Sequence, residues 1–213
     1  MRKIKALVTA GPTREYLDPI RYLSNASSGR TGLSVARALK KRGVSVRLVL
    51  GPGVDAPRGI PGFRAGSARD MFGLVKRNFE WCDVFISCAA VADYRPDTVS
   101  RKKIKKTSAS RTLKLVPNPD ILREMGRRKG GRFLAGFALE DSGGFNEARR
   151  KMKLKNCDLM VLNGPDTVDA DRISAALLSP DRKPLKLGKM SKEKFAQKLC
   201  QEILSSLKPS KNM

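Results

Sequence analysis

Short apolar stretches alternate with longer amphipathic ones along most of this chain, and this alternation is the feature that most limits its fold. The apolar stretches have strand length and are bounded by glycine, proline or polar residues, whereas the amphipathic stretches repeat apolar residues at helical spacing. Strands that alternate with helices form a mostly parallel sheet with helices on both faces. The pattern therefore predicts a Rossmann-like, doubly wound α/β fold, with residues 1–213 as one domain.

The element boundaries follow from the same periodicity and from turn residues. Strands are predicted over 4–9, 44–50, 62–65, 84–88, 113–116, 133–138 and 158–162. Helices are predicted over 33–42, 68–79, 119–128 with Asn118 as its N-cap, 146–155 and 192–207. A hairpin of 175–178 and 184–187 is appended to the sheet. The lysine-rich stretch 99–111 can bury little, so we expect a flexible flap there and a frayed tail over 208–213.

Composition excludes several kinds of chemistry. The chain has no histidine, which rules out a Ser-His-Asp triad and leaves its four cysteines without the usual zinc partners. We interpret these cysteines as reduced, mostly buried thiols. No apolar run approaches the roughly 20 residues of a membrane helix, so we expect a cytoplasmic protein with no membrane partner.

The formal net charge of +24 calls for an anionic partner, either nucleic acid or a phosphorylated metabolite. Composition alone does not choose between them. Most of these charges are explained by solvated faces and a general basic bias, because such runs usually lie on exposed surfaces.

Residues 11–32 form an unusually long connection between the first strand and the first helix. Glycine, serine and asparagine let backbone N–H groups approach an oxyanion, and the positive end of the following helix favours negative charge. The segment matches neither the P-loop nor the GxGxxG pattern. An anion-binding loop is the favoured interpretation, and an exposed capping loop is the alternative.

Six ordered segments are similar to phosphopantothenoylcysteine synthetase of the bacterial type, over about residues 3–207. They are TAGPTRE at 9–15, RYLSNASSG at 21–29, CAAVADYR at 88–95, KIKK at 103–106, NPDI at 118–121 and GFALE at 136–140. In that family the domain often follows a flavin-dependent decarboxylase, and we expect a standalone form here. The resemblance implies a ligase of coenzyme A biosynthesis that joins 4'-phosphopantothenate to L-cysteine.

The resemblance also implies the reaction sequence and the partners. The carboxylate is activated by CTP, with Mg²⁺ accompanying the triphosphate, to give an acyl-cytidylate and pyrophosphate; the cysteine amine then displaces CMP. Such chemistry depends on positioning and charge neutralisation, for which no histidine is needed. The family further suggests a homodimer. No metal ligands and no reason for CTP rather than ATP can be derived from the residues themselves.

The residues that match family positions fall into three groups. Asn25 and Lys103 are the catalytic candidates, the first for holding the acyl group and the second for bringing a cation to the triphosphate. The nucleotide-binding candidates are Ser87, Cys88, Ala89, Asp93, Lys103, Pro119, Asp120, Ile121, Leu122, Phe137, Lys151 and Lys155. The candidates for the substrate phosphate and acyl group are Gly11, Asn25, Ser27, Ser28, Gly29 and Arg30.

Two positions depart from the family pattern. Ala26 stands where histidine is common, and Arg30 where lysine is common; arginine still offers a phosphate partner. Without the resemblance, Asn25 is interpreted as a cap or turn residue and Phe137 as a core residue.

Two other functions stay open: a nucleic-acid-binding protein on a retired synthetase fold, and a dinucleotide-dependent oxidoreductase. Sparse aromatics disfavour the first, and the missing GxGxxG disfavours the second.

Overall fold

The computed structural model describes residues 2–140, 144–167 and 170–207, so the predicted frayed tail 208–213 lies outside the described residues. The strands of its main sheet are β1 (Lys5–Ala10), β4 (Ser45–Leu50), β5 (Gly62–Arg64), β6 (Val84–Ser87), β9 (Phe133–Leu139), β10 (Leu159–Asn163), β11 (Arg172–Leu178) and β12 (Leu185–Ser191). Their order is β12-β11-β10-β9-β6-β1-β4-β5. Strands β10 through β5 pair in parallel, and β11 and β12 add an antiparallel hairpin. The predicted mostly parallel sheet and its late hairpin are confirmed.

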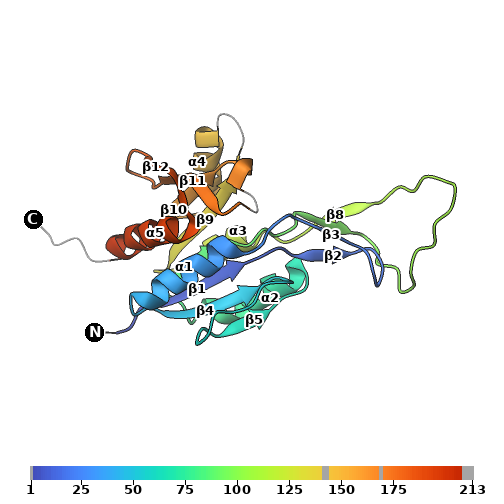
Figure 1. Cartoon of the computed structure of the whole chain (residues 1–213), viewed down its shortest axis with the longest axis horizontal. Coiled ribbons are helices and arrows are strands. Elements are labelled where there is room, and N and C mark those ends of the chain that lie inside the picture. The colour runs from blue at the N-terminus through green and yellow to red at the C-terminus, as the bar shows by residue number, and fades with distance from the viewer. Residues whose placement is uncertain (1, 141–143, 168–169, 208–213) are drawn as a thin grey trace, which may run out of the picture.

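Helices cover both faces of the sheet, as Figure 1 shows. They are α1 (Arg30–Lys41), α2 (Ala68–Phe79), α3 (Ile121–Arg127), α4 (Gly144–Leu154) and α5 (Lys192–Ser206), with a short 3-10 turn η1 (Pro165–Thr167). One apolar cluster joins the sheet to α1 and α5, and a second joins it to α2, α3 and α4. Strand β1 shows why both clusters form: Ala6 and Val8 belong to the first and Leu7 to the second, because successive side chains leave opposite faces.

Two small hairpins form an arm that the sequence analysis did not predict. Strand β2 (Arg14–Tyr16) pairs with β3 (Tyr22–Ser24), and β7 (Tyr94–Pro96) pairs with β8 (Leu115–Pro117). Figure 1 shows both hairpins extending away from the helices, with the loop between β7 and β8 at the far end. The interpretation of 11–32 as one continuous loop was therefore wrong, and the predicted strand 113–116 lies in the arm instead of the main sheet.

Three helix starts also differ from the prediction, and α4 begins at Gly144, two residues early. Helix α3 is capped by Asp120, whose side chain accepts a hydrogen bond from the Arg123 amide, whereas Asn118 was expected to be the cap. The amide of Asn118 instead donates to the carbonyl of Ala92 at 2.9 Å. Helix α1 begins at Arg30, three residues before the predicted start, because Gly29 turns the chain in a left-handed conformation with φ of 71°.

The cysteines behave as the sequence analysis expected. All four are free thiols; Cys82, Cys157 and Cys200 are buried and Cys88 is half-buried. Among the residues that the structure describes, no helix has both the length and the apolar composition needed to cross a membrane.

Candidate functional site

The carboxyl edge of the sheet has a topological switch point between β1 and β6. From β1 the chain continues to β4 and β5 on one side, then returns to β6 on the other side. The loops that follow β1 and β6 therefore diverge, and such a crevice is where ligands of open α/β sheets bind. Both loops carry residues that the sequence analysis selected, the first from Gly11 onward and the second from Cys88 onward.

Two buried threonines connect these loops. The Thr9 hydroxyl accepts hydrogen bonds from the amides of Cys88 and Ala89, both at 3.1 Å, and the Thr13 hydroxyl accepts one from the Ala92 amide at 3.0 Å. The Ala90 amide donates to the carbonyl of Gly11 at 2.9 Å. Both threonines lie within the TAGPTRE motif at 9–15, but nothing in the sequence indicated that their hydroxyls shape the other loop.

A pocket opens where the β6 loop meets the start of α3. Nine of the twelve predicted nucleotide-binding residues line it, which brings together four segments that are separate in the sequence. The nine are Ser87, Ala89, Asp93, Pro119, Asp120, Ile121, Leu122, Phe137 and Lys155. Val91, Ala92 and Asn118 complete the lining and were missed; Ala92 and Asn118 each adjoin a selected residue, and Val91 lies between the selected Ala89 and Asp93.

Charged groups stand at two places in this pocket. The Lys155 ammonium lies 3.0 Å from Oδ2 of Asp120, whose Oδ1 accepts from the Arg123 amide, also at 3.0 Å. One carboxylate thus caps α3 and orients a lysine. Asp93 is exposed, and its carboxylate makes no hydrogen bond or ion pair with any residue of the described ranges. The pocket therefore offers one oriented cation and one accessible carboxylate to a ligand.

Asn25 lies against the same loop from the other side. Its side-chain amide donates to the carbonyl of Val91 at 3.0 Å and more weakly to that of Ala90 at 3.4 Å. Because Val91 lines the pocket described above, Asn25 adjoins the wall of that pocket. Because the side-chain nitrogen of Asn25 donates to these carbonyls, its side-chain oxygen remains available to accept a hydrogen bond from a ligand.

The N-terminus of α1 faces this edge of the sheet with no acidic residue in its first turn and no side-chain cap. The Gly29 amide donates a long hydrogen bond to the Ser27 hydroxyl at 3.4 Å. Added Cβ atoms at Gly11 and Gly29 would lie 2.6 and 2.8 Å from a methyl group of Val54, so the tight path of this segment requires glycine at both positions. The segment has the geometry of an anion-binding helix start.

Four predicted residues are placed differently from the rest. Arg30 forms an ion pair with Asp171, and Lys151 forms one with Glu140, so both cations are directed to carboxylates of the chain itself. Lys103 lies in the loop between β7 and β8 and does not line the pocket. Cys88 also stays outside the lining, and burial raises the pKa of its thiol to about 12, which keeps it protonated and unreactive near neutral pH.

Within the described ranges, the side chains alone do not form a metal site. The structure, over its described ranges, contains no group of three or more Cys, Asp or Glu side chains arranged to hold a metal ion. Mg²⁺ needs only one or two carboxylates when substrate phosphates supply its other ligands. Asp93 and Asp120 are the pocket carboxylates that could serve in this way.

Comparison with known proteins identifies the family of the chain. The model of the family "DNA/pantothenate metabolism flavoprotein C-terminal domain" matches residues 1–207. The chain is 37% identical over 209 residues to the coenzyme A biosynthesis bifunctional protein CoaBC of Haemophilus influenzae, covering 96% of this chain and 52% of that protein. It is also 37% identical over 203 residues to CoaBC of Bacillus subtilis, covering 92% of this chain and 50% of the relative.

A solved structure gives the same result in three dimensions. The crystal structure of the C-terminal domain of a CoaBC protein is 32% identical and superposes with a TM-score of 0.84, covering 97% of each chain. The chain thus spans about half the length of the curated relatives that it matches, and corresponds to a domain whose fold has been solved. The family match, the two relatives and this superposition together show that the chain belongs to the family of the DNA/pantothenate metabolism flavoprotein C-terminal domain, in agreement with the resemblance carried by its motifs.

Proposed function

We propose that this chain catalyses the ligase step of coenzyme A biosynthesis, in which 4'-phosphopantothenate and L-cysteine are joined through an acyl-cytidylate. The observation that carries the proposal is the pocket, in which nine residues selected from separate motifs meet beside Asn25. The CoaBC relatives are proteins of coenzyme A biosynthesis, which supports the proposal. Family membership favours this enzyme over a nucleic-acid-binding protein or an oxidoreductase. The proposal includes a cytoplasmic location.

The first half-reaction requires the nucleotide and phosphopantothenate to bind at adjacent sites, with their reacting atoms facing each other. A carboxylate oxygen of phosphopantothenate attacks the α-phosphorus of CTP, and the bond to the departing pyrophosphate breaks. The pocket between Ser87 and Lys155 would hold the nucleotide, and the segment from Asn25 to Arg30 would hold the phosphopantothenoyl group. Because the threonine hydrogen bonds fix the loop between these sites, they would keep the reacting atoms in a set orientation.

The charge that develops on the triphosphate needs cations. Lys155 is already oriented in the pocket, and Lys103 would be brought to the phosphates by the loop between β7 and β8. Bound Mg²⁺ would neutralise phosphate charge, and Asp93 is the exposed pocket carboxylate that could hold it.

The experiment that tests the proposal separates the two half-reactions. Purified protein with CTP, Mg²⁺ and phosphopantothenate is expected to release pyrophosphate, and to release CMP only when L-cysteine is added. A parallel reaction with ATP measures nucleotide selectivity. Folded protein that releases neither product would overturn the proposed function.

Asn25 is expected to act mainly in the second half-reaction. Its free acceptor oxygen would receive an N–H of the attacking cysteine amine, which directs the nitrogen lone pair at the acyl carbonyl. We expect Asn25→Ala to slow CMP release by about tenfold, roughly the worth of one neutral hydrogen bond, with little change in the pyrophosphate burst. Rapid-quench measurement of both products checks this; an equal loss in both steps would contradict it.

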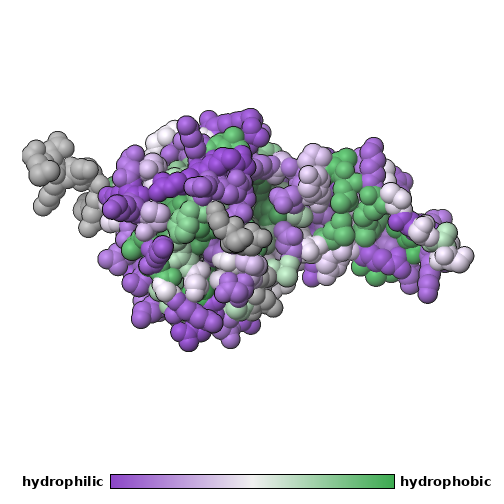
Figure 2. All heavy atoms as spheres, turned by 90° about the horizontal axis from the view of Figure 1, so that it is seen from above, coloured by the Kyte–Doolittle hydropathy of each residue, from purple (hydrophilic) through white to green (hydrophobic). Residues whose placement is uncertain are grey.

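We also propose that the enzyme is a homodimer joined through the arm. Large apolar side chains are exposed on both of its hairpins and their connecting loops: Tyr16, Ile20, Tyr22, Tyr94, Val99, Leu113 and Leu115. Figure 2 shows an apolar patch on this extension, bordered by hydrophilic residues. A patch of this kind on a projecting element is typical of an interface between protein chains.

Charge placed in this patch is expected to separate the subunits. The double variant Val99→Asp, Leu115→Asp puts carboxylates where we expect another apolar surface, whereas both side chains are solvent-exposed within one chain. Light scattering should give twice the chain mass for the unmodified protein and the single-chain mass for the variant. Leu185→Asp, an exposed leucine on β12, serves as the control; an equal effect there would argue against the arm.

A further inference from the structure

A buried carboxylate ties the flap to the tip of the β2–β3 hairpin. Asp18 lies in the turn between β2 and β3, and its side chain has no exposed surface. Its Oδ1 accepts hydrogen bonds from the amides of Ile20 and Arg21, both at 2.8 Å, which fold the turn. Its Oδ2 accepts from Nη1 of Arg21 at 2.7 Å and from the amide of Ile104 at 3.0 Å. One oxygen of the carboxylate therefore binds the backbone of the turn, and the other binds both the Arg21 side chain and the flap.

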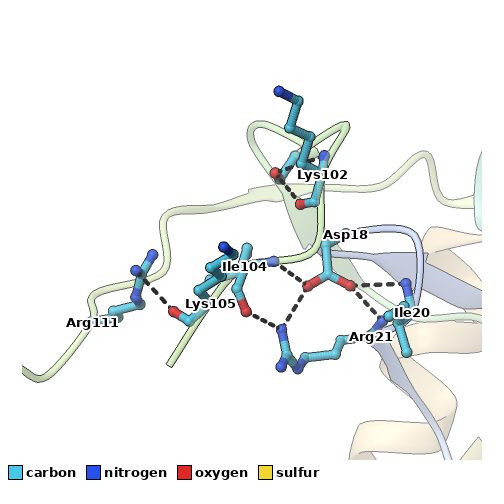
Figure 3. Close-up of polar contacts among 8 residues, drawn as sticks. Asp18, Ile20, Arg21, Lys102, Ile104, Lys105 and Arg111 are labelled. Atoms are coloured by element: carbon cyan, nitrogen blue, oxygen red, sulfur yellow. Dashed lines mark hydrogen bonds and ion pairs between the residues drawn. The ribbon is translucent and has the colours of Figure 1, made fainter. Parts of the chain in front are cut away.

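Ile104 is held at both of its backbone polar groups. Its amide reaches Asp18, and its carbonyl accepts from the same Nη1 of Arg21 at 2.8 Å, so that three residues close a small ring of hydrogen bonds (Figure 3). A further bond joins the Ser100 amide to the carbonyl of Leu17 at 2.9 Å. Ile104 is half-buried, whereas the lysines beside it in sequence are exposed. The first half of the flap is thus attached to the hairpin.

The electrostatics keep this attachment intact over the physiological pH range. The amide of Ile104 contributes most to a pKa of Asp18 well below its usual range, followed by the amides and guanidinium of the turn, while burial opposes them. The carboxylate is therefore ionised at neutral pH. A charged acceptor makes stronger hydrogen bonds than a neutral one, so the ionised carboxylate strengthens the hydrogen bond from the Ile104 amide.

We propose that Asp18 is a positioning residue for Lys103: it fixes the backbone of Ile104, the next residue, and so sets where the Lys103 ammonium is presented. This role rests on the proposed function, in which Lys103 meets the triphosphate. A flap that was free over its whole length would have to be ordered at every turnover, at a cost in conformational entropy for each residue fixed. The hydrogen bond to Asp18 orders the flap at Ile104, directly beside Lys103, the lysine proposed to act in the reaction.

Substitution by asparagine removes the flap contact selectively. An amide side chain has one acceptor oxygen and one NH2 donor, whereas Asp18 uses both oxygens as acceptors. If the oxygen stays with the two turn amides, the NH2 group faces the Ile104 amide and the Arg21 guanidinium, which are themselves donors. Asp18→Asn should therefore preserve the hairpin and release the flap.

The test measures pyrophosphate release and amide hydrogen exchange on the unmodified protein and on variants. Asp18→Asn is expected to lower kcat for pyrophosphate release by about 10- to 100-fold, the usual effect of a misplaced catalytic group, and to speed exchange of the peptide spanning 100–106. In a Lys103→Ala background, the same substitution should change the residual rate by less than about twofold, because Asp18 acts through that lysine. Asp18→Glu, which keeps both acceptor oxygens, should recover part of the rate.

Asp97→Asn is the matched control, because it makes the same charge change near the base of the same loop, where Asp97 pairs with Lys114 on the surface at 2.9 Å. It should leave both readouts unchanged. The positioning role is overturned if Asp18→Asn keeps the full rate and exchange pattern, or if it reduces the rate equally in both backgrounds. An inactive unmodified enzyme overturns the proposed function, and this role with it; an active enzyme that is indifferent to Asp18→Asn overturns this role alone.

Discussion

Replacement of Lys103 by alanine is expected to reduce pyrophosphate release by about 100- to 1,000-fold, the usual loss when one group that stabilises transition-state charge is removed. The thermal midpoint should stay the same, because the Lys103 side chain is exposed and forms no ion pair with any residue in the described ranges. Pyrophosphate release measured without L-cysteine isolates the step. Loss of rate without loss of stability would show that the lysine acts in the chemistry.

Lys106→Ala is the control for this prediction. Lys106 is exposed in the same loop, and its replacement lowers the net charge by the same amount. If attraction of the anionic nucleotide to a basic loop were all that mattered, both variants would lose a similar amount of rate and added salt would remove the difference. A rate for Lys103→Ala close to that of Lys106→Ala would exclude a specific role.

The centre of the main sheet could be predicted from sequence because its central strands are buried on both faces. Strands such as β1 and β6 read as short apolar runs, and the helices between them show helical periodicity, so local pattern and tertiary packing agree. The arm could not be predicted in the same way. Strands β2 and β3 have three residues each and no buried apolar face to mark them, and β7 finds its partner β8 only after the long flap.

The site was predictable to the extent that its residues lie at strand ends. Ser87 and Phe137 belong to neighbouring parallel strands, so their meeting at one pocket follows from the fold. The position of Lys103 does not follow, since it depends on the arm. The partner of Lys151 was equally hidden: Glu140 follows β9, and only the paired geometry of β9 and α4 brings the two together.

The contact between α3 and the end of α4 shows how backbone packing supports the pocket. Gly126 lies in α3 against the Lys155 backbone, and the Asn156 side chain donates to the Gly126 carbonyl at 3.0 Å. Asn156 itself has a φ of 52°, which ends the helical turn. This close crossing brings the Lys155 ammonium to Asp120, and so connects the packing of two helices to the charge arrangement in the pocket.

Gly126→Ala is expected to destabilise the protein by about 2–3 kcal/mol, near the upper part of the range for overpacked sites. A Cβ at this position would lie 2.1 Å from the carbonyl oxygen of Lys155 and 2.9 Å from its carbon, and backbone atoms cannot rotate away as a side chain does. The helix preference of alanine over glycine returns at most about 1 kcal/mol. Separation of α3 from α4 should also weaken CTP binding, because Lys155 moves away from Asp120. Denaturant unfolding and nucleotide titration measure the two effects.

Gly73→Ala distinguishes this clash from the general effect of replacing a helical glycine. Gly73 lies inside α2, and the nearest heavy atom to an added Cβ is the end of the flexible Arg77 side chain at 3.7 Å. With no clash, helix preference alone decides the sign, and stability should rise by roughly 0.5–1 kcal/mol. The two substitutions are chemically identical, so opposite signs would assign the loss at Gly126 to contact with the Lys155 backbone. A stabilised Gly126→Ala protein with unchanged CTP affinity would mean that α3 can move without disturbing the pocket.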